Sequence, residues 1–141
     1  MARELYMIGI VVKDMPAALA FYRRLGLAIP EDAERRTHVQ VPMGGGLTFF
    51  LDANPTVWDP KFARGEAAPP AAGSYGTILE FYLKSRAEVD QTYADLIAGG
   101  YASHAAPYET PFKMYFAMVY DPDGNIVLLS GDLGDQAPPE S

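Results

Sequence analysis

The stretch LYMIGIVVKDMPAALAFYRRLGL, residues 5–27, changes its hydrophobic period near its middle. Its first apolar residues stand at every second position, the period of a strand with one face in a core: Ile8, Ile10 and Val12. The later apolar residues follow helical spacing instead: Ala18, Phe21, Tyr22 and Leu25. Asp14 is suited to cap such a helix and Gly26 to end it, because glycine adopts the left-handed conformation without steric cost. The stretch therefore predicts a strand followed by a short amphipathic helix.

The same pattern returns in TILEFYLKSRAEVDQTYADLIAGG, residues 77–100. The two stretches match without a gap at one constant offset, with Ile8 over Leu79 and Asp14 over Ser85. A match of both the strand face and the helix cap predicts an internal duplication.

Three strand-like segments follow each helix. The first set is LAIPE, THVQVPM and LTFFLD, and the second is YASHAAP, KMYFAMVYD and NIVLLS. The glycine-containing runs MGGG and DPDG are typical of turns between the last two strands of each set. We therefore predict an α+β fold of two tandem β-α-β-β-β modules, residues 4–52 and 76–130. A Pro- and Ala-rich linker or lid over residues 53–75 joins them, and residues 131–141 form a tail.

Length and composition limit the classes of function. The chain has 141 residues, the size of one ordinary domain over residues 1–141, and it has no cysteine for disulfides or thiolate catalysis. The formal net charge of −7 argues against nucleic-acid binding, which depends on Lys and Arg. No apolar run reaches the roughly 20 residues of a membrane-spanning helix, and no signal peptide is evident, so we expect a cytoplasmic protein without a membrane partner.

Two motifs carry a resemblance to a known family: VVKDMPAALAFYRRLGL in the first half and YDPDGNIVLLSG near the end. With the duplication, the chain resembles the vicinal-oxygen-chelate superfamily, which contains glyoxalase I, extradiol dioxygenases, fosfomycin-resistance enzymes and bleomycin-resistance binding proteins. The resemblance implies a curved mixed sheet around a central cleft, with the helices on its outer face. It also implies a homodimer.

Metal-dependent members of this superfamily place ligands on the cleft side of the first and last strand of each module. Strand alternation assigns those four positions to apolar residues in this chain: Met7, Phe50, Ile78 and Leu128. Of the four, only methionine coordinates metals, and it does so softly. We therefore expect no metal and no other cofactor.

The cleft side of the strands is predicted to be mostly apolar and aromatic, which is typical of a small-molecule site. The predicted ligand-binding residues are Met7, His38, Phe50, Asp52, Trp58, Ile78, Glu80, Tyr82, Met118 and Leu128. Structural roles compete with this interpretation. The aliphatic residues can fill a core, Glu80 and Tyr82 can lie on an exposed strand face, and Trp58 can pin the linker to the body. The pattern places no carboxylate beside either histidine, His38 or His104.

Two functions from different classes follow. The first is a metal-free protein that sequesters an aromatic or cationic natural product or antibiotic, as the bleomycin-resistance branch does. The second is a metal-independent isomerase, cyclase or lyase that uses His38, Glu80 or Tyr82 as acid or base. A third possibility is an assembly partner without a small-molecule role. The sequence does not separate the first two.

Overall fold

The change from strand to helix in the N-terminal stretch is present in the computed structural model, which describes residues 4–62 and 77–134. β1 spans Met7–Val11 and α1 spans Met15–Leu25. The Asp14 carboxylate accepts a hydrogen bond from the Ala17 amide, and Gly26 ends the helix in the left-handed conformation with φ 116°. Both predicted ends of the helix are confirmed.

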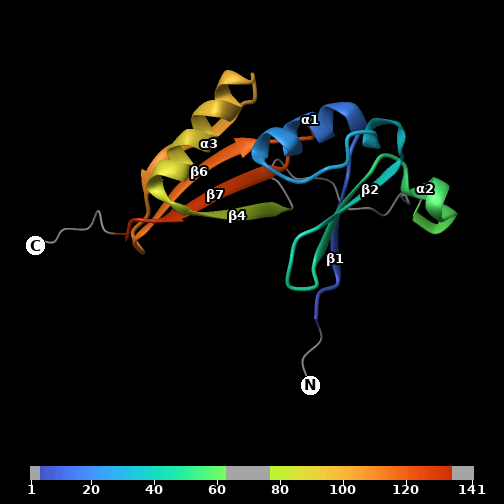
Figure 1. The fold of residues 1–141 in the computed structure, drawn as a ribbon, viewed down its shortest axis with the longest axis horizontal. Coiled ribbons are helices and arrows are strands. Elements are labelled where there is room, and N and C mark those ends of the chain that lie inside the picture. Colours follow the sequence, from blue (N-terminus) through green and yellow to red (C-terminus); the bar gives the residue numbers. More distant parts are fainter. Residues whose placement is uncertain (1–3, 63–76, 135–141) are drawn as a thin grey trace, which may run out of the picture. The chain divides into compact units, whose positions relative to one another are not determined.

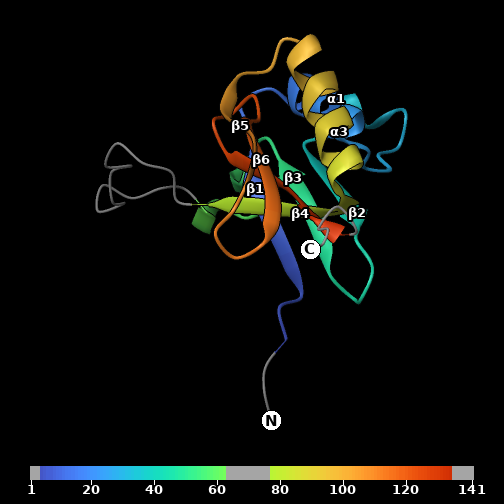
Figure 2. The same cartoon turned by 90° about the vertical axis from the view of Figure 1, so that its left-hand side faces the viewer.

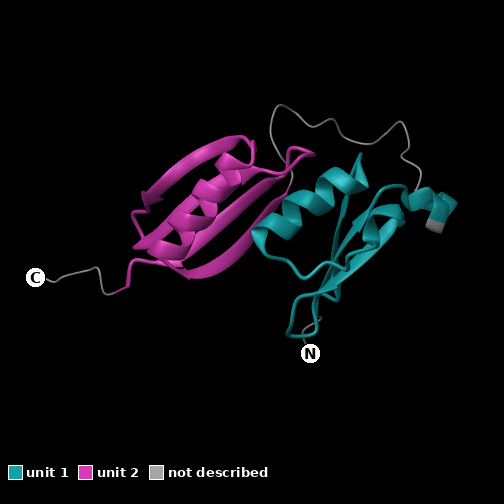
Figure 3. Ribbon diagram, turned by 45° about the horizontal axis from the view of Figure 1, so that its top comes forward, with its two compact units in different colours: residues 1–70 teal, residues 71–141 magenta. Residues whose placement is uncertain are grey.

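The chain divides into two units, residues 1–70 and 71–141 (Figure 3). In unit 1, β2 (His38–Pro42) and β3 (Thr48–Asp52) join β1 in a three-stranded sheet of order β1-β3-β2. β1 runs parallel to β3, and β2 runs antiparallel to it. The Tyr22 ring on α1 lies 5.4 Å from the Phe49 ring on β3, which places the helix over the Phe49 side of the sheet. Both side chains are buried, so this side is the core of unit 1.

Residues 27–31 do not form the predicted strand, and unit 1 therefore has one strand fewer than its predicted module. The Leu27 amide bonds to the Tyr22 carbonyl as the chain leaves α1, and the Ile29 amide bonds to the Leu27 carbonyl. Pro30 has no N–H to give to a neighbouring strand. Ile29 is buried without strand pairing, and the short 3-10 helix η1 (Ala33–Arg35) follows. The apolar spacing that predicted a strand here belongs instead to a loop in which Ile29 is buried.

Unit 2 contains all of its predicted elements. These are β4 (Ile78–Ser85), α3 (Arg86–Ala98), β5 (Ser103–Glu109), β6 (Met114–Tyr120) and β7 (Ile126–Asp132), with sheet order β4-β7-β6-β5. β4 and β7 are parallel and the other pairs are antiparallel. The Ser85 hydroxyl accepts a hydrogen bond from the Glu88 amide and caps α3, as predicted. β7 runs on to Asp132, so the first two residues of the predicted tail belong to the sheet.

Among the described residues of each unit, the unit's own long helix lies over one face of its sheet, and no helix of the same unit lies over the other face. In unit 2, α3 lies along the sheet formed by β4, β7 and β6 (Figures 1 and 2). Strand alternation then assigns the even-numbered residues of β6, of β7 and, as far as Tyr82, of β4 to the other face, which we call the helix-free face of unit 2. The helix-free face of unit 1 is assigned in the same way and contains Met7, Gly9, His38, Gln40, Thr48, Phe50 and Asp52. The two mixed sheets confirm the α+β class. The central cleft stays a prediction.

The first part of the predicted linker has regular structure. Asn54 caps the short helix α2 (Pro55–Trp58), and the 3-10 helix η2 (Pro60–Phe62) follows. Residues 63–75 of the linker lie outside the described residues. In the described parts of the chain, none of the helices has the length and apolar character needed to cross a membrane.

Candidate functional site

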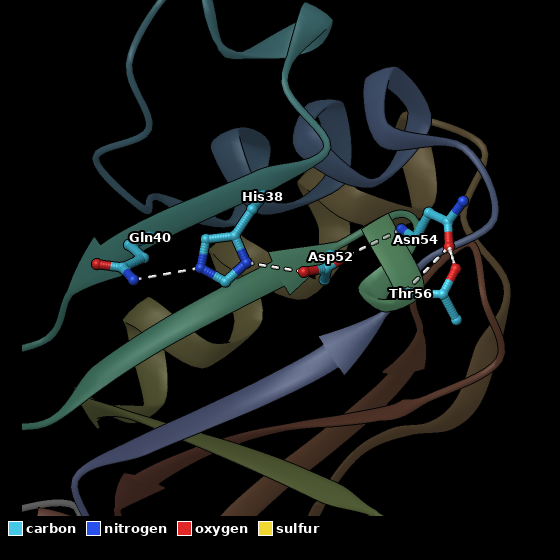
Figure 4. A network of polar contacts seen from close by, with 5 residues as sticks. All are labelled: His38, Gln40, Asp52, Asn54 and Thr56. Atoms are coloured by element: carbon cyan, nitrogen blue, oxygen red, sulfur yellow. Dashed lines mark hydrogen bonds and ion pairs between the residues drawn. The ribbon is translucent and has the colours of Figure 1, made fainter. Parts of the chain in front are cut away.

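The helix-free face of unit 1 carries a histidine paired with a carboxylate. The hairpin register of β2 and β3 places His38 opposite Asp52, and the His38 Nδ1 atom lies 2.8 Å from Asp52 Oδ2 (Figure 4). The Asp52 side chain is 2% exposed and the His38 side chain is 29% exposed. The pair thus joins a buried carboxylate to a ring that solutes can reach.

Both oxygens of Asp52 are used. Oδ2 faces His38, and Oδ1 accepts a hydrogen bond of 2.8 Å from the Asn54 amide. Asn54 in turn accepts hydrogen bonds from the amide and hydroxyl of Thr56 at the start of α2 (Figure 4). A buried carboxylate is costly unless it is paired and hydrogen-bonded, and these contacts meet that need. They also hold Asp52 in one orientation toward the histidine.

The contacts of His38 determine which ring nitrogen carries the proton. A carboxylate only accepts hydrogen bonds, so Nδ1–H donates to Asp52. In the neutral ring, Nε2 is then an acceptor, and the Gln40 amide nitrogen lies 3.2 Å from it. The His38 ring also lies beside the Phe50 ring, with centroids 4.9 Å apart and planes tilted by 35°. The basic nitrogen is therefore located next to a flat aromatic surface.

Phe50 lies over the backbone of β1. A Cβ atom added at Gly9 would have three ring carbons of Phe50 within 2.5 Å, which a real Cβ never tolerates. Gly9 pairs with Phe50 in the parallel register, so the absent side chain makes room for the ring. The position of Phe50 beside His38 thus depends on a glycine in the neighbouring strand.

The helix-free face of unit 2 is apolar along its middle strand. Ile126 and Leu128 on β7 are 0% and 7% exposed, although they point away from the face that α3 covers. On β6, Phe116 and Met118 lie across from Ser130 and Leu128. Ile126 and Leu128 are therefore already shielded from water, and the exposed large side chains of this face are Ile78 and Tyr82 on β4, each 54% exposed.

Aromatic side chains gather at one side of this face. The Phe116 ring lies 6.1 Å from the Tyr108 ring and 5.6 Å from the Phe112 ring, both in edge-to-face arrangements. Phe112 is 64% exposed and Tyr108 is 38% exposed. We call Tyr108, Phe112 and Phe116 the aromatic cluster.

Polar pairs lie at the two ends of β7. At its C-terminal end, the Tyr82 hydroxyl donates a hydrogen bond of 2.7 Å to Asp132 Oδ2. This bond raises the pKa of Tyr82, and burial and the charge of Asp132 act in the same direction. At the other end, His104 Nδ1 lies 2.6 Å from the hydroxyl of Tyr120, which pairs with Ile126. At about 3.3 Å per strand residue, the pairs are about 20 Å apart.

Ser130 is a buried hydroxyl on the same face. Its side-chain oxygen is fully buried and has no hydrogen-bond partner among the described residues. An unsatisfied buried hydroxyl costs about 1–3 kcal/mol, so its retention requires a reason. Ser130 on β7 is the counterpart of Asp52 on β3 in the duplication. Tyr82 on β4 pairs with Ser130, and its counterpart Val11 on β1 pairs with Asp52. The two halves of the duplication have thus diverged at this position.

The residues at the superfamily's metal positions do not fit a divalent metal. Met7, Phe50, Ile78 and Leu128 offer no oxygen or nitrogen donor, and zinc, magnesium and manganese require such donors or thiolates. Across residues 4–62 and 77–134, the structure brings together no group of three or more His, Cys, Asp or Glu side chains that could hold a metal ion. The donor chemistry therefore supports no metal-dependent step at these positions.

The structure brings the predicted site residues together in two groups. Met7, His38, Phe50 and Asp52 share the helix-free face of unit 1. Ile78, Glu80, Tyr82, Met118 and Leu128 share that of unit 2. Trp58 lies in α2, and its side chain is outside the described residues. Ligand binding by these residues stays a prediction.

Sequence reasoning missed three features of these faces. The pairing of His38 with Asp52 follows from the hairpin register, which the MGGG turn between β2 and β3 signals in the sequence. Gln40 follows from His38 by strand alternation. Asp132 was assigned to the tail, and nothing in the sequence marked it as a strand residue.

Comparison with known proteins identifies the class. The family model of the Glyoxalase/Bleomycin resistance protein/Dioxygenase superfamily matches residues 5–129, and the chain belongs to this superfamily. No curated protein matches the sequence.

Several solved structures share the fold. A glyoxalase/bleomycin resistance protein/dioxygenase family enzyme from Burkholderia phytofirmans PsJN is 22% identical, with a TM-score of 0.71 over 93% of this chain and 100% of that one. A glyoxalase-related enzyme from Fulvimarina pelagi is 17% identical, with a TM-score of 0.73 over 93% and 89%. A lactoylglutathione lyase from Agrobacterium tumefaciens is 23% identical, with a TM-score of 0.64 over 92% and 94%. These similarities show the fold and leave the bleomycin-resistance branch unconfirmed for this chain.

Proposed function

We propose that this protein is a metal-free small-molecule binder, which sequesters a planar aromatic and preferably cationic compound on the helix-free face of unit 2. The observation that carries the proposal is the aromatic cluster, in which the rings of Tyr108 and Phe112 both contact the ring of Phe116 and are themselves exposed. Removal of flat apolar surface from water contributes about 25 cal/mol per Å², and each aromatic contact adds about 0.5–1.5 kcal/mol.

The charges around this face support a cationic ligand. Glu80 on β4 and Asp132 at the end of β7 are both exposed, and the chain as a whole has a formal net charge of −7. Tyr82 holds one oxygen of Asp132 by a hydrogen bond, which orients the carboxylate for a second partner. An amine or other positive group at this end, with a flat ring over the aromatic cluster, matches both features. The proposed ligands are therefore natural-product antibiotics that combine a flat ring with a positive charge.

Titration with two related probes tests the proposal. We expect 9-aminoacridine, which is planar and cationic at pH 7.5, to bind with a micromolar dissociation constant in isothermal titration calorimetry. Neutral acridine should bind more weakly. F112A should weaken both probes by about 2- to 12-fold, which corresponds to one stacking contact. D132N should weaken 9-aminoacridine more than acridine.

A matched variant controls for unspecific apolar binding. Val57 in unit 1 is 67% exposed, close to the 64% of Phe112, so V57A truncates a smaller but equally exposed apolar side chain outside the proposed face. V57A should leave both dissociation constants unchanged. Equal effects of V57A and F112A, or absence of binding, would exclude the proposed face. Recovery of a chemically altered probe would refute sequestration.

The proposal includes the homodimer expected from the resemblance. Sedimentation at micromolar concentration should give a mass of two chains. A monomer under these conditions would remove this part of the proposal and leave the binding face to be tested by the probes.

A metal-independent lyase or isomerase is the second candidate function. One observation favours it, the pairing of His38 with buried Asp52 in unit 1. A carboxylate that orients a histidine is a common arrangement for proton transfer in enzymes.

A further inference from the structure

We propose that His38 is a general base, which removes a proton from a planar, weakly acidic substrate on the helix-free face of unit 1, with Asp52 as its positioning residue. This inference rests on the second candidate function and deepens it, and it uses none of the residues proposed to bind a ligand on unit 2. It assigns an activity of the elimination or isomerisation class to unit 1.

Asp52 fixes the tautomer of the neutral His38 ring. Asp52 accepts from Nδ1–H at 2.8 Å, so the lone pair of a neutral His38 ring is on Nε2. Asp52 keeps its orientation because its second oxygen is held by the Asn54 amide at 2.8 Å. When Nε2 takes a proton, the positive ring lies against a negative carboxylate, which stabilises the charge that develops during proton transfer.

Nε2 of His38 lies at the accessible side of the sheet edge. The amide of Gln40 lies 3.2 Å from this atom, and Gln40 is an exposed residue on the edge strand β2. A long hydrogen bond from an exposed amide can be replaced by a substrate proton without burying a polar group. The lone pair therefore faces a position that a substrate can occupy.

The Phe50 ring provides a flat aromatic surface beside His38. The Phe50 ring lies 4.9 Å from the His38 ring and rests over Gly9, where no side chain displaces it. A planar substrate that stacks on Phe50 presents its edge to the neighbouring imidazole. The substrate class is therefore an aromatic or conjugated compound with an acidic C–H or O–H in its plane.

The probe 5-nitrobenzisoxazole has this chemistry. Nε2 of His38 forms a bond to the proton at ring carbon 3, and the electron pair of that C–H bond becomes part of the product nitrile. The ring N–O bond breaks, and the phenolate oxygen keeps its electron pair. The proton then passes from the imidazolium to water, so the base is regenerated and no oxidant or reductant takes part.

The experiment follows formation of the coloured cyanonitrophenolate at pH 7.5 with wild-type protein and variants. We expect the wild type to exceed an equal concentration of free imidazole, and H38Q to lose about 100-fold of the rate, as is typical for removal of a general base. The matched control is H104Q, because His104 lies on unit 2 and its Nδ1 atom contacts the phenol of Tyr120. H104Q should keep the wild-type rate.

Asp52 needs a measurement that a purely structural role would leave unchanged. Long-range 1H–15N NMR should show Nε2 of neutral His38 without a proton in the wild type and a mixture of tautomers in D52N, together with a lower rate. Q40A, which removes the exposed amide that the substrate proton is expected to replace, should increase the rate whether or not D52N folds. A rate for H38Q within twofold of the wild type, an equal loss in H104Q, or a tenfold loss in Q40A would overturn the proposal.

Discussion

Replacement of Gly9 by alanine tests whether Phe50 rests on β1. The new Cβ would lie within 2.5 Å of Phe50 Cζ, Cε1 and Cε2, so the ring must leave its position. Because these atoms are the far end of a half-buried side chain that can swing aside, we expect a cost of about 1 kcal/mol, the low end for overpacking. The backbone itself accepts alanine, because Gly9 does not have a positive φ. In the F50A background the same change should stabilise by about 0.4–1 kcal/mol, since alanine restricts the unfolded chain.

The difference between the two backgrounds is therefore about 1.5–2 kcal/mol. Urea unfolding of wild type, G9A, F50A and G9A/F50A measures it, with far-UV circular dichroism and tryptophan fluorescence as probes. Trp58 is the only tryptophan and belongs to unit 1, so its signal reports on the unit that carries the mutation. Equal costs of G9A in both backgrounds would refute the contact between Phe50 and Gly9, and with it the aromatic surface beside His38.

Four further predictions concern other parts of the chain. G131A should destabilise by about 2–3 kcal/mol in thermal unfolding, because its Cβ would lie 2.7 Å from the Ser85 carbonyl oxygen. S130A should stabilise the free protein by about 1 kcal/mol in the same assay, because the lost hydroxyl has no partner among the described residues. Burial and the hydrogen bond to Asp90 raise the pKa of Tyr115. The contribution of Tyr115 to stability is therefore complete below pH about 10 and is lost as pH rises through the higher pKa of the folded state. This loss of stability at high pH should be smaller in Y115F. Elemental analysis should find no stoichiometric divalent metal, and one Zn, Mn or Fe per chain would contradict the argument from the donor set.

The local order of elements could be predicted from the sequence, because short-range chemistry determines it. Alternation from Ile8 to Val12, the Asp14 cap and the Gly26 stop each act within a few residues, and each predicts its element correctly. The duplication extended this success to β4 and α3. The prediction of a strand at LAIPE failed because Ile29 is buried in a loop, and apolar spacing alone does not distinguish such a loop from a strand.

The faces of the strands were also predictable, since alternation assigns each residue to one side. What the alternation could not supply was which residues meet across the strands. His38 and Asp52 are 14 positions apart, and their contact depends on the register of the β2–β3 hairpin. Tyr82 and Asp132 are 50 positions apart and meet because parallel pairing brings β4 beside β7. The sequence determines which side chains point to the helix-free faces, and only the tertiary structure decides their partners, because hydrogen bonds and burial between distant residues arise from strand pairing.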